Sequence, residues 1–107
     1  DDGTGTYSCG RGATTWPVCS KPAGNTAQGL CDMAGNVWEW VADWYGPYDE
    51  APADGSARSA QGDDVSRVRR GGSWRYTASS LRAAVRSGYA PDAHHGFLGF
   101  RVVRSAP

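Results

Sequence analysis

Cysteine, histidine and acidic side chains are the groups in this 107-residue sequence that could do covalent or metal chemistry. The three cysteines, Cys9, Cys19 and Cys31, lie in the first third of the chain, and none has the CxxC spacing of a zinc or redox site. The segment between Cys19 and Cys31 is rich in turn-forming residues, so the sequence predicts a disulfide between them. A disulfide implies an oxidising compartment, which makes the protein secreted or periplasmic. The alternative is a cytosolic protein with three reduced, buried thiols.

A second candidate site lies in the segment GLCDMAGNVWEW, residues 29–40. Asp32 precedes a turn and Glu39 lies on the strand expected after it, so carboxylate and backbone oxygens could converge there. Oxygen ligands suit a hard cation such as Ca²⁺. The spacing is not that of an EF-hand, because a loop starting at Asp32 would place Val37 where glycine is required. The alternative is that Asp32 caps the turn and Glu39 pairs with an arginine.

Short strands and long loops are expected to position these groups. In residues 36–44 the side chains of Trp38, Trp40, Ala42 and Trp44 alternate with the others, which predicts a strand whose aromatic face packs on the core. Residues 45–66 read as a long acidic loop.

The second half of the chain continues this pattern. Residues 67–74 predict a strand, a Gly-Gly bend and a tryptophan anchor, and residues 98–104 predict a closing strand that joins the core. Residues 79–86 are the one segment with a helical pattern. The sequence therefore predicts a loop-rich domain with little helix.

Charge is distributed unevenly in a chain whose formal net charge is zero. Residues 1–64 hold ten acidic and three basic residues, whereas residues 65–107 hold eight arginines and one acidic residue. Because the arginines are spaced among apolar positions, we expect the two halves to fold onto each other as ionic partners. Neutrality argues against a nucleic-acid or membrane-surface binder, and no stretch is long and apolar enough to cross a bilayer. A nucleic-acid alternative rests on four arginines near aromatic residues, Arg67, Arg69, Arg70 and Arg75.

Three motifs in order, GLCDMAGNVWEW, RVRRGGSW and LGFRVV, resemble the sulfatase-modifying-factor family, the formylglycine-generating-enzyme-like domain. The resemblance implies an α+β fold that is a variant of the C-type lectin fold. It covers residues 29–107 well and residues 1–28 loosely, and it matches the C-terminal part of that domain. We therefore expect residues 1–107 to be the C-terminal portion of a single domain, completed by a missing N-terminal segment or a second chain.

The resemblance also implies metal sites. The family's second calcium site carries over to the side chains of Asp32 and Glu39 and the carbonyls of Gly35 and Val37. Family members that oxidise a sulfatase cysteine bind copper(I) through two cysteines after the GGS-aromatic motif, and thiolates are the ligands that copper(I) prefers. The corresponding positions here hold Tyr76 and Leu81, so copper is not expected. A related branch holds iron through histidines, but adjacent histidines on a strand point to opposite faces, so His94 and His95 fit one metal poorly.

Binding is the function that this reasoning leaves. The segments after Trp74 are small, polar and aromatic, and they resemble the variable region of proteins that retroelements diversify. The candidates for a ligand-contacting surface are Tyr76, Thr77, Ser79, Tyr89, His94 and His95. The prediction is a calcium-stabilised module that recognises a protein or a small ligand. The alternative is part of a formylglycine-generating or related oxidoreductase whose catalytic residues lie partly elsewhere.

Overall fold

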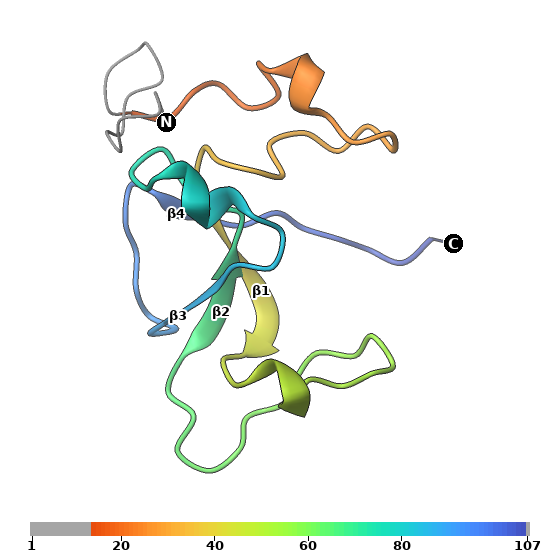
Figure 1. The fold of residues 1–107 in the computed structure, drawn as a ribbon, viewed down its shortest axis with the longest axis vertical. Coiled ribbons are helices and arrows are strands. Elements are labelled where there is room, and N and C mark those ends of the chain that lie inside the picture. The colour runs from red at the N-terminus through yellow and green to blue at the C-terminus, as the bar shows by residue number, and fades with distance from the viewer. Residues whose placement is uncertain (1–13, 107) are drawn as a thin grey trace.

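A single four-stranded mixed sheet organises the fold. The computed structural model describes residues 14–106. Its strands are β1 (Trp38–Trp44), β2 (Arg67–Arg70), β3 (Arg86–Tyr89) and β4 (Leu98–Gly99), arranged in the order β3-β2-β1-β4. β2 is antiparallel to both β1 and β3, whereas β4 runs parallel to β1 at the opposite edge (Figure 1). Three short 3-10 helices lie in the connections: η1 (Pro22–Gly24), η2 (Tyr48–Glu50) and η3 (Ala78–Leu81).

β1 forms where the alternating pattern predicts it, but it has one aromatic residue in the core. Trp38 is 1% exposed, whereas Trp40 and Trp44 are half-buried and Ala42 is exposed. The register against β2 shifts between Trp40 and Trp44, so the simple alternation of faces is broken there. The expectation that four alternate residues face one core was therefore wrong beyond Trp38. Val68 on β2 is the other fully buried apolar residue of the described chain.

The predicted Gly-Gly bend after β2 is confirmed. Gly71 and Gly72 have φ angles of +93° and +68°, which L-residues with a side chain rarely adopt. The bend also brings the chain close to residues 29–37, because Gly71 accepts a hydrogen bond from the Gly35 N–H (2.7 Å). The Trp74 N–H donates to the carbonyl of Asn36 (2.8 Å). These contacts join the first and second sequence motifs into one unit.

The helix predicted over residues 79–86 is wrong. The chain forms η3, leaves helical geometry at Arg82 (φ −62°, ψ 139°) and then enters β3. β3 pairs with β2 along all four of its residues. An isolated helix of two turns gains little from propagation after its costly nucleation, so the pairing with the sheet decides the conformation.

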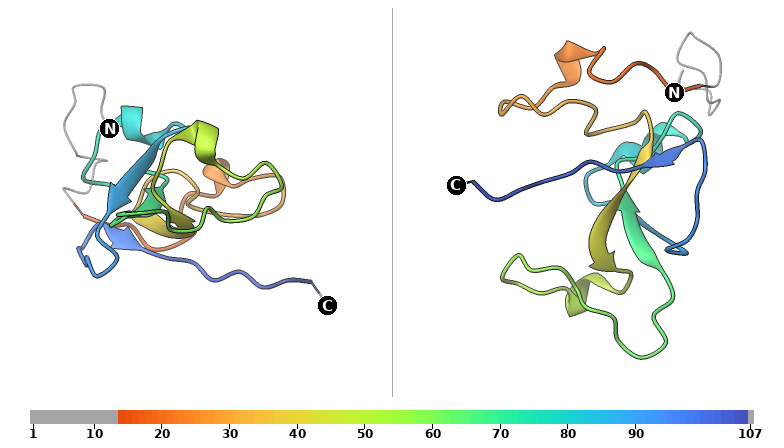
Figure 2. Two further views of the ribbon diagram at one scale, coloured as in Figure 1. Left: turned by 90° about the horizontal axis from the view of Figure 1, so that it is seen from below. Right: turned by 180° about the vertical axis from the view of Figure 1, so that it is seen from behind.

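The closing strand is shorter than predicted. β4 consists of two residues paired to β1, and the chain beyond it runs extended away from the sheet (Figures 1 and 2). Phe100, Val102 and Val103 are 74%, 86% and 90% exposed, so the expectation that this segment forms part of the core is wrong for the chain as it stands. Among the described residues, the structure contains no helix with the length and apolar character needed to cross a membrane.

Candidate ligand pocket and metal-binding loop

A cavity of about 260 Å³ lies between residues 16–36 and the segment that follows the Gly-Gly bend. Tyr76 and Leu81, the two positions that replace the copper-binding cysteines in the resemblance, both line this cavity. Its other lining residues come from residues 16–36 and the segment after β2: Trp16, Lys21, Gly24, Asp32, Met33, Ala34, Gly35, Asn36, Ser73 and Trp74. The cavity is therefore lined by residues from two segments, one ending in the first motif and one beginning in the second.

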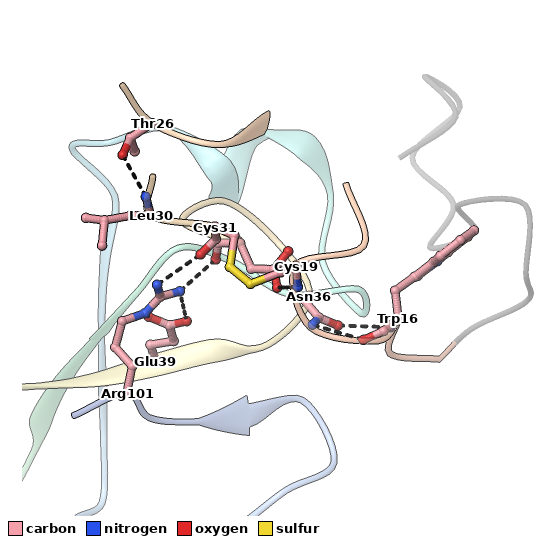
Figure 3. Close-up of a disulfide and its surroundings, with 9 residues drawn as sticks. Trp16, Cys19, Thr26, Leu30, Cys31, Asn36, Glu39 and Arg101 are labelled. Carbon is pink, nitrogen blue, oxygen red and sulfur yellow. Dashed lines mark hydrogen bonds and ion pairs between the residues drawn. A yellow bond between two sulfur atoms is a disulfide. The ribbon is translucent and has the colours of Figure 1, made fainter. Parts of the chain in front are cut away.

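The loop that forms one wall is closed by the predicted disulfide. Cys19 and Cys31 are bonded, with Cα atoms 5.2 Å apart, which confirms the pairing (Figure 3). Cys9 lies outside the described residues. Asn36 holds the start of this wall, because its side chain accepts from the Trp16 N–H (3.0 Å) and donates to the Trp16 carbonyl (3.2 Å). These two hydrogen bonds tie Trp16 to a turn that lies 20 residues later in the sequence.

The pocket combines aromatic walls with one basic group. The Lys21 ammonium lies 3.7 Å from the centroid of the Trp16 ring, a cation–π contact. Ser73 is 3% exposed, and its hydroxyl accepts a hydrogen bond from the Arg75 N–H (3.3 Å). The Trp74 indole N–H donates to the carbonyl of Gly96 (3.2 Å), which fixes the orientation of that ring. Sequence reasoning missed Trp16 and Lys21, because they lie in a segment without periodicity.

The four residues predicted to bind calcium follow the disulfide-closed loop, from Asp32 to Glu39 on β1, but both carboxylates already have partners. Arg101 donates to both oxygens of Glu39, with its Nε 2.7 Å from Oε2 (Figure 3). Asp32 Oδ2 accepts from the Cys19 N–H at 2.7 Å. These are the contacts of the alternative interpretation, a turn-capping aspartate and an arginine-paired glutamate. The donor types suit calcium, but an ion at Glu39 would have to displace Arg101. Calcium therefore stays a prediction.

Arg101 connects three parts of this loop region. Besides Glu39, it donates to the carbonyls of Cys31 (2.9 Å) and Asp32 (3.1 Å). Its hydrogen bonds to the Glu39 carboxylate raise the pKa of the Arg101 guanidinium. A fully charged, bidentate guanidinium thus takes the position of a cation beside these oxygens.

The six predicted surface residues separate into distinct groups, and Tyr76 alone lines the pocket. Thr77 and Ser79 share a hydrogen bond between their hydroxyls (2.8 Å). The Tyr89 hydroxyl contacts His95 Nε2 at 3.0 Å, and the His95 ring stacks on Phe97 with centroids 4.9 Å apart. His94 Nδ1 approaches the carbonyl of Asp92 instead (3.4 Å). The two histidines thus have separate partners, and neither lies on a strand.

Arg69 is a buried cation that sequence reasoning did not single out as a core residue. It is 3% exposed, and aromatic rings surround its guanidinium, with the Tyr89 centroid at 4.2 Å and the Trp38 centroid at 4.7 Å. A long hydrogen bond joins its Nη2 to the Tyr76 hydroxyl (3.4 Å). Within the described part of the chain, its Nε and Nη1 have no hydrogen-bond partner.

The expected ionic pairing of the two halves is largely wrong. Of the three ion pairs between side chains in residues 14–106, one joins the halves, Arg101 with Glu39. The other two lie within the acidic half, where Arg58 binds Glu50 (2.8 Å) and Asp64 (2.7 Å). Three other arginines of the basic half bind backbone carbonyls instead: Arg67 at Ala42, Arg70 at Ala83 and Arg82 at Ser79.

Comparison with known proteins settles the family. The family model described as the sulfatase-modifying factor enzyme 1-like domain matches residues 3–106. The chain belongs to this family. Its loop-rich mixed sheet with little helix is the C-type-lectin-like fold of formylglycine-generating-enzyme-like domains. The solved structure of PvdO from Pseudomonas aeruginosa superposes with a TM-score of 0.78 at 34% identity, over 94% of this chain and 41% of that one.

Curated relatives in this family carry different names. The formylglycine-generating enzyme of Streptomyces coelicolor is 40% identical over 97 residues, which cover 87% of this chain and 30% of that protein. The serine/threonine-protein kinase pkn1 of Chlamydia caviae is 41% identical over 92 residues, covering 84% of this chain and 15% of that protein. The chain thus spans less than a third of these curated relatives. The family is shared between proteins named for different activities, so the site must decide the function.

Proposed function

We propose that this sulfatase-modifying-factor-like domain recognises a small ligand in the pocket between the disulfide-closed loop and the Gly-Gly bend. One observation supports the proposal above the others. The two positions that hold copper-binding cysteines in oxidising members are Tyr76 and Leu81, and both line the 260 Å³ cavity. An aromatic and an aliphatic side chain there replace metal ligands with apolar contact surface.

The lining defines the class of ligand. Trp16, Trp74, Tyr76 and Leu81 offer flat and apolar surface, the kind that buries an aromatic ring. Lys21 is the one basic residue of the lining, and it can pair with an anion at the pocket edge. We therefore expect a planar, apolar molecule that carries one anionic group.

Indole-3-acetate is a suitable probe, and the tryptophan indole N–H signals report where it binds. In a ¹H–¹⁵N spectrum of the disulfide-bonded protein, we expect the signals of Trp16 and Trp74 to move on titration. The signals of Trp40 and Trp44 are the internal control, because neither residue lines the pocket. Titration to millimolar concentration without a shift at Trp16 and Trp74 would overturn the proposal.

A matched pair of ligands tests the role of Lys21. Indole-3-acetamide keeps the ring and the shape of the acetate but has no charge. The variant Lys21→Gln should weaken binding of the acetate by roughly tenfold, one ionic hydrogen bond, and leave the amide unchanged. If instead the protein binds copper(I) stoichiometrically and oxidises a cysteine-containing sulfatase peptide, the second candidate function, that of the Streptomyces relative, is the correct one.

Calcium enters the proposal as a competitor of Arg101. The ion would take Glu39 and Asp32 with the carbonyls of Gly35 and Val37, and Arg101 would leave Glu39. We therefore expect Arg101→Gln to bind calcium more tightly than the wild type in calorimetric titration. Absence of calcium binding in both proteins would remove calcium from the proposal and leave the pocket untouched.

The cellular compartment is inferred from the disulfide between Cys19 and Cys31. A structural disulfide forms and persists in an oxidising environment, which supports a secreted or periplasmic protein. The partner, beyond the small ligand, would be the remaining part of the domain, on an N-terminal segment or a second chain.

A further inference from the structure

Three side chains at the disulfide bring metal-binding atoms together, and one of them, Asp32, is shared with the predicted calcium ligands. The Sγ atoms of Cys19 and Cys31 and a carboxylate oxygen of Asp32 all lie within 4.8 Å of one another. In the chain from residue 14 to residue 106, this is the one place where three cysteine, histidine or acidic side chains meet so closely.

Contacts other than the disulfide hold these residues in place. The Cys19 N–H donates to Asp32 Oδ2 (2.7 Å), so the carboxylate is turned toward the cysteine. Arg101 donates to the carbonyls of Cys31 and Asp32, which fixes the backbone of both residues (Figure 3). Cys19 and Asp32 have φ angles of +58° and +54°, a region that residues with a side chain occupy infrequently.

We propose that the reduced form of this loop binds a zinc-class divalent cation through Cys19, Cys31 and Asp32. A dithiol reductant gives two electrons and two protons to the disulfide, which becomes two thiols while the reductant becomes a disulfide. The cation then binds both sulfurs as thiolates and releases the two thiol protons to solvent. Two sulfurs and one oxygen are a donor set for zinc, and a water molecule completes four-coordination.

Exposure and charge both favour this chemistry. Cys19 is exposed and Cys31 is half-buried, so a reductant and a cation can reach the sulfurs from solvent. Two thiolates and a carboxylate carry three negative charges, and a divalent cation leaves one. The guanidinium of Arg101, which is paired with Glu39, also donates to the backbone carbonyls of Cys31 and Asp32 and so places a positive charge near the site.

The consequence concerns the pocket. The loop closed by Cys19 and Cys31 supplies Lys21 and Gly24 to its wall. A metal ion joining the same two cysteines would close the same loop, so the wall would persist in a reducing environment. The bound cation therefore substitutes for the disulfide as the closure of the loop.

Cobalt(II) titration tests the site directly, because thiolate ligands give a charge-transfer absorption in the near ultraviolet. The protein carries Cys9→Ser to remove the third thiol, is reduced with a phosphine without oxygen and is then freed of reductant. We expect one equivalent of cobalt to give the thiolate band, and zinc to displace it. The oxidised protein should show no band, and zinc should raise the melting temperature of the reduced form only.

Variants separate this site from adventitious metal binding. Asp32→Asn should weaken cobalt binding about tenfold or more, by analogy with ligand losses at metal sites, whereas Asp54→Asn, which changes an exposed carboxylate of the acidic loop, should not. Near-ultraviolet circular dichroism checks that each reduced variant is folded. Failure of the reduced, folded protein to give the band, or equal affinity in Asp32→Asn, would overturn the proposal. Neither result depends on whether the pocket binds indole-3-acetate.

Discussion

Two arginines of this domain are almost fully buried but have opposite surroundings. Arg58 is 5% exposed and binds the carboxylates of Glu50 and Asp64. Arg69 is 3% exposed and is surrounded by aromatic rings, without a carboxylate among its described contacts. Ring faces compensate a buried cation only in part, since each contact contributes about 0.5–2 kcal/mol. Removal of one member of a buried ion pair, by contrast, leaves the charge of the other member without a partner.

The same substitution should therefore act differently at these two positions. Arg69→Met removes an unpaired buried charge and keeps much of the side-chain volume, so the free energy of unfolding should stay within about 1 kcal/mol of the wild type or rise. Arg58→Met leaves Glu50 and Asp64 without their cation, so the protein should become less stable. Urea unfolding of both variants measures the difference. A larger loss of stability in Arg69→Met than in Arg58→Met would contradict this assignment.

At the scale of elements, the turn between β2 and η3 positions the pocket wall. A Cβ added to Gly72 would lie 2.7 Å from Leu81 Cδ2 and 3.0 Å from the Ser80 carbonyl oxygen. Leu81 lines the cavity, so the close approach at Gly72 is what places this side of the pocket. Gly62 also has a positive φ, +56°, but no atom lies within 4 Å of an added Cβ.

Alanine substitutions at Gly62 and Gly72 separate the energetic cost of packing from the cost of backbone strain. Both Gly62→Ala and Gly72→Ala introduce a side chain at positive φ, which costs roughly 1–2 kcal/mol. Gly72→Ala also forces Leu81 and the Ser80 backbone to move, so we expect it to lose about 1–3 kcal/mol more and to weaken indole-3-acetate binding. Denaturant unfolding and the ligand titration measure both effects. Equal losses in the two variants would mean that the contact at Gly72 does not matter.

The features predicted correctly are those whose conformation depends mainly on residues that are close in the sequence. Alternation in residues 36–44 predicted β1, and Gly71 with Gly72 predicted the bend. The disulfide also followed from a short, turn-rich loop. Residues 79–86 could not be assigned from their own pattern, because a partner strand, β2, decides their conformation. Lys21 in the pocket and the burial of Arg69 likewise depend on contacts between distant segments, for which no local pattern gives a signal.

The acidic loop between β1 and β2 should respond to pH through Asp64. A hydrogen bond from the Gln61 N–H and the Arg58 guanidinium hold the pKa of this carboxyl below its usual value. A lowered pKa in the folded state stabilises the protein above the ordinary aspartate pKa of about 3.9. That stability is lost as the pH falls through the lower folded value.

Asp64→Asn removes the titrating group and with it this pH dependence. The melting temperature of the wild type should exceed that of Asp64→Asn at pH 7, and the difference should shrink as the pH is lowered below about 4. Melting curves at a series of pH values give the comparison. A difference that grows toward acidic pH would have the wrong sign for this interaction.

At the scale of the whole molecule, the β4 edge of the sheet is short. β4 pairs through two residues, and the apolar side chains of Phe100, Val102 and Val103 follow it into solvent. The chain covers 41% of the solved PvdO structure, so most of that relative lies outside the matched region. An exposed apolar edge is a template for pairing with another strand. We therefore expect a strand from beyond residues 14–106 to cover it.

In a solution that contains this chain alone, we expect the β4 edge of one copy to pair with the β4 edge of a second copy. The weight-average mass in sedimentation equilibrium should thus rise with protein concentration. Val102→Lys places a charge in the exposed apolar segment that follows β4 and should abolish the rise. Val65→Lys is the matched control, because Val65 is also exposed (73%) and on no strand but lies in the acidic loop between β1 and β2. A monomeric wild type at high concentration, or equal association in both variants, would show that the edge needs no partner.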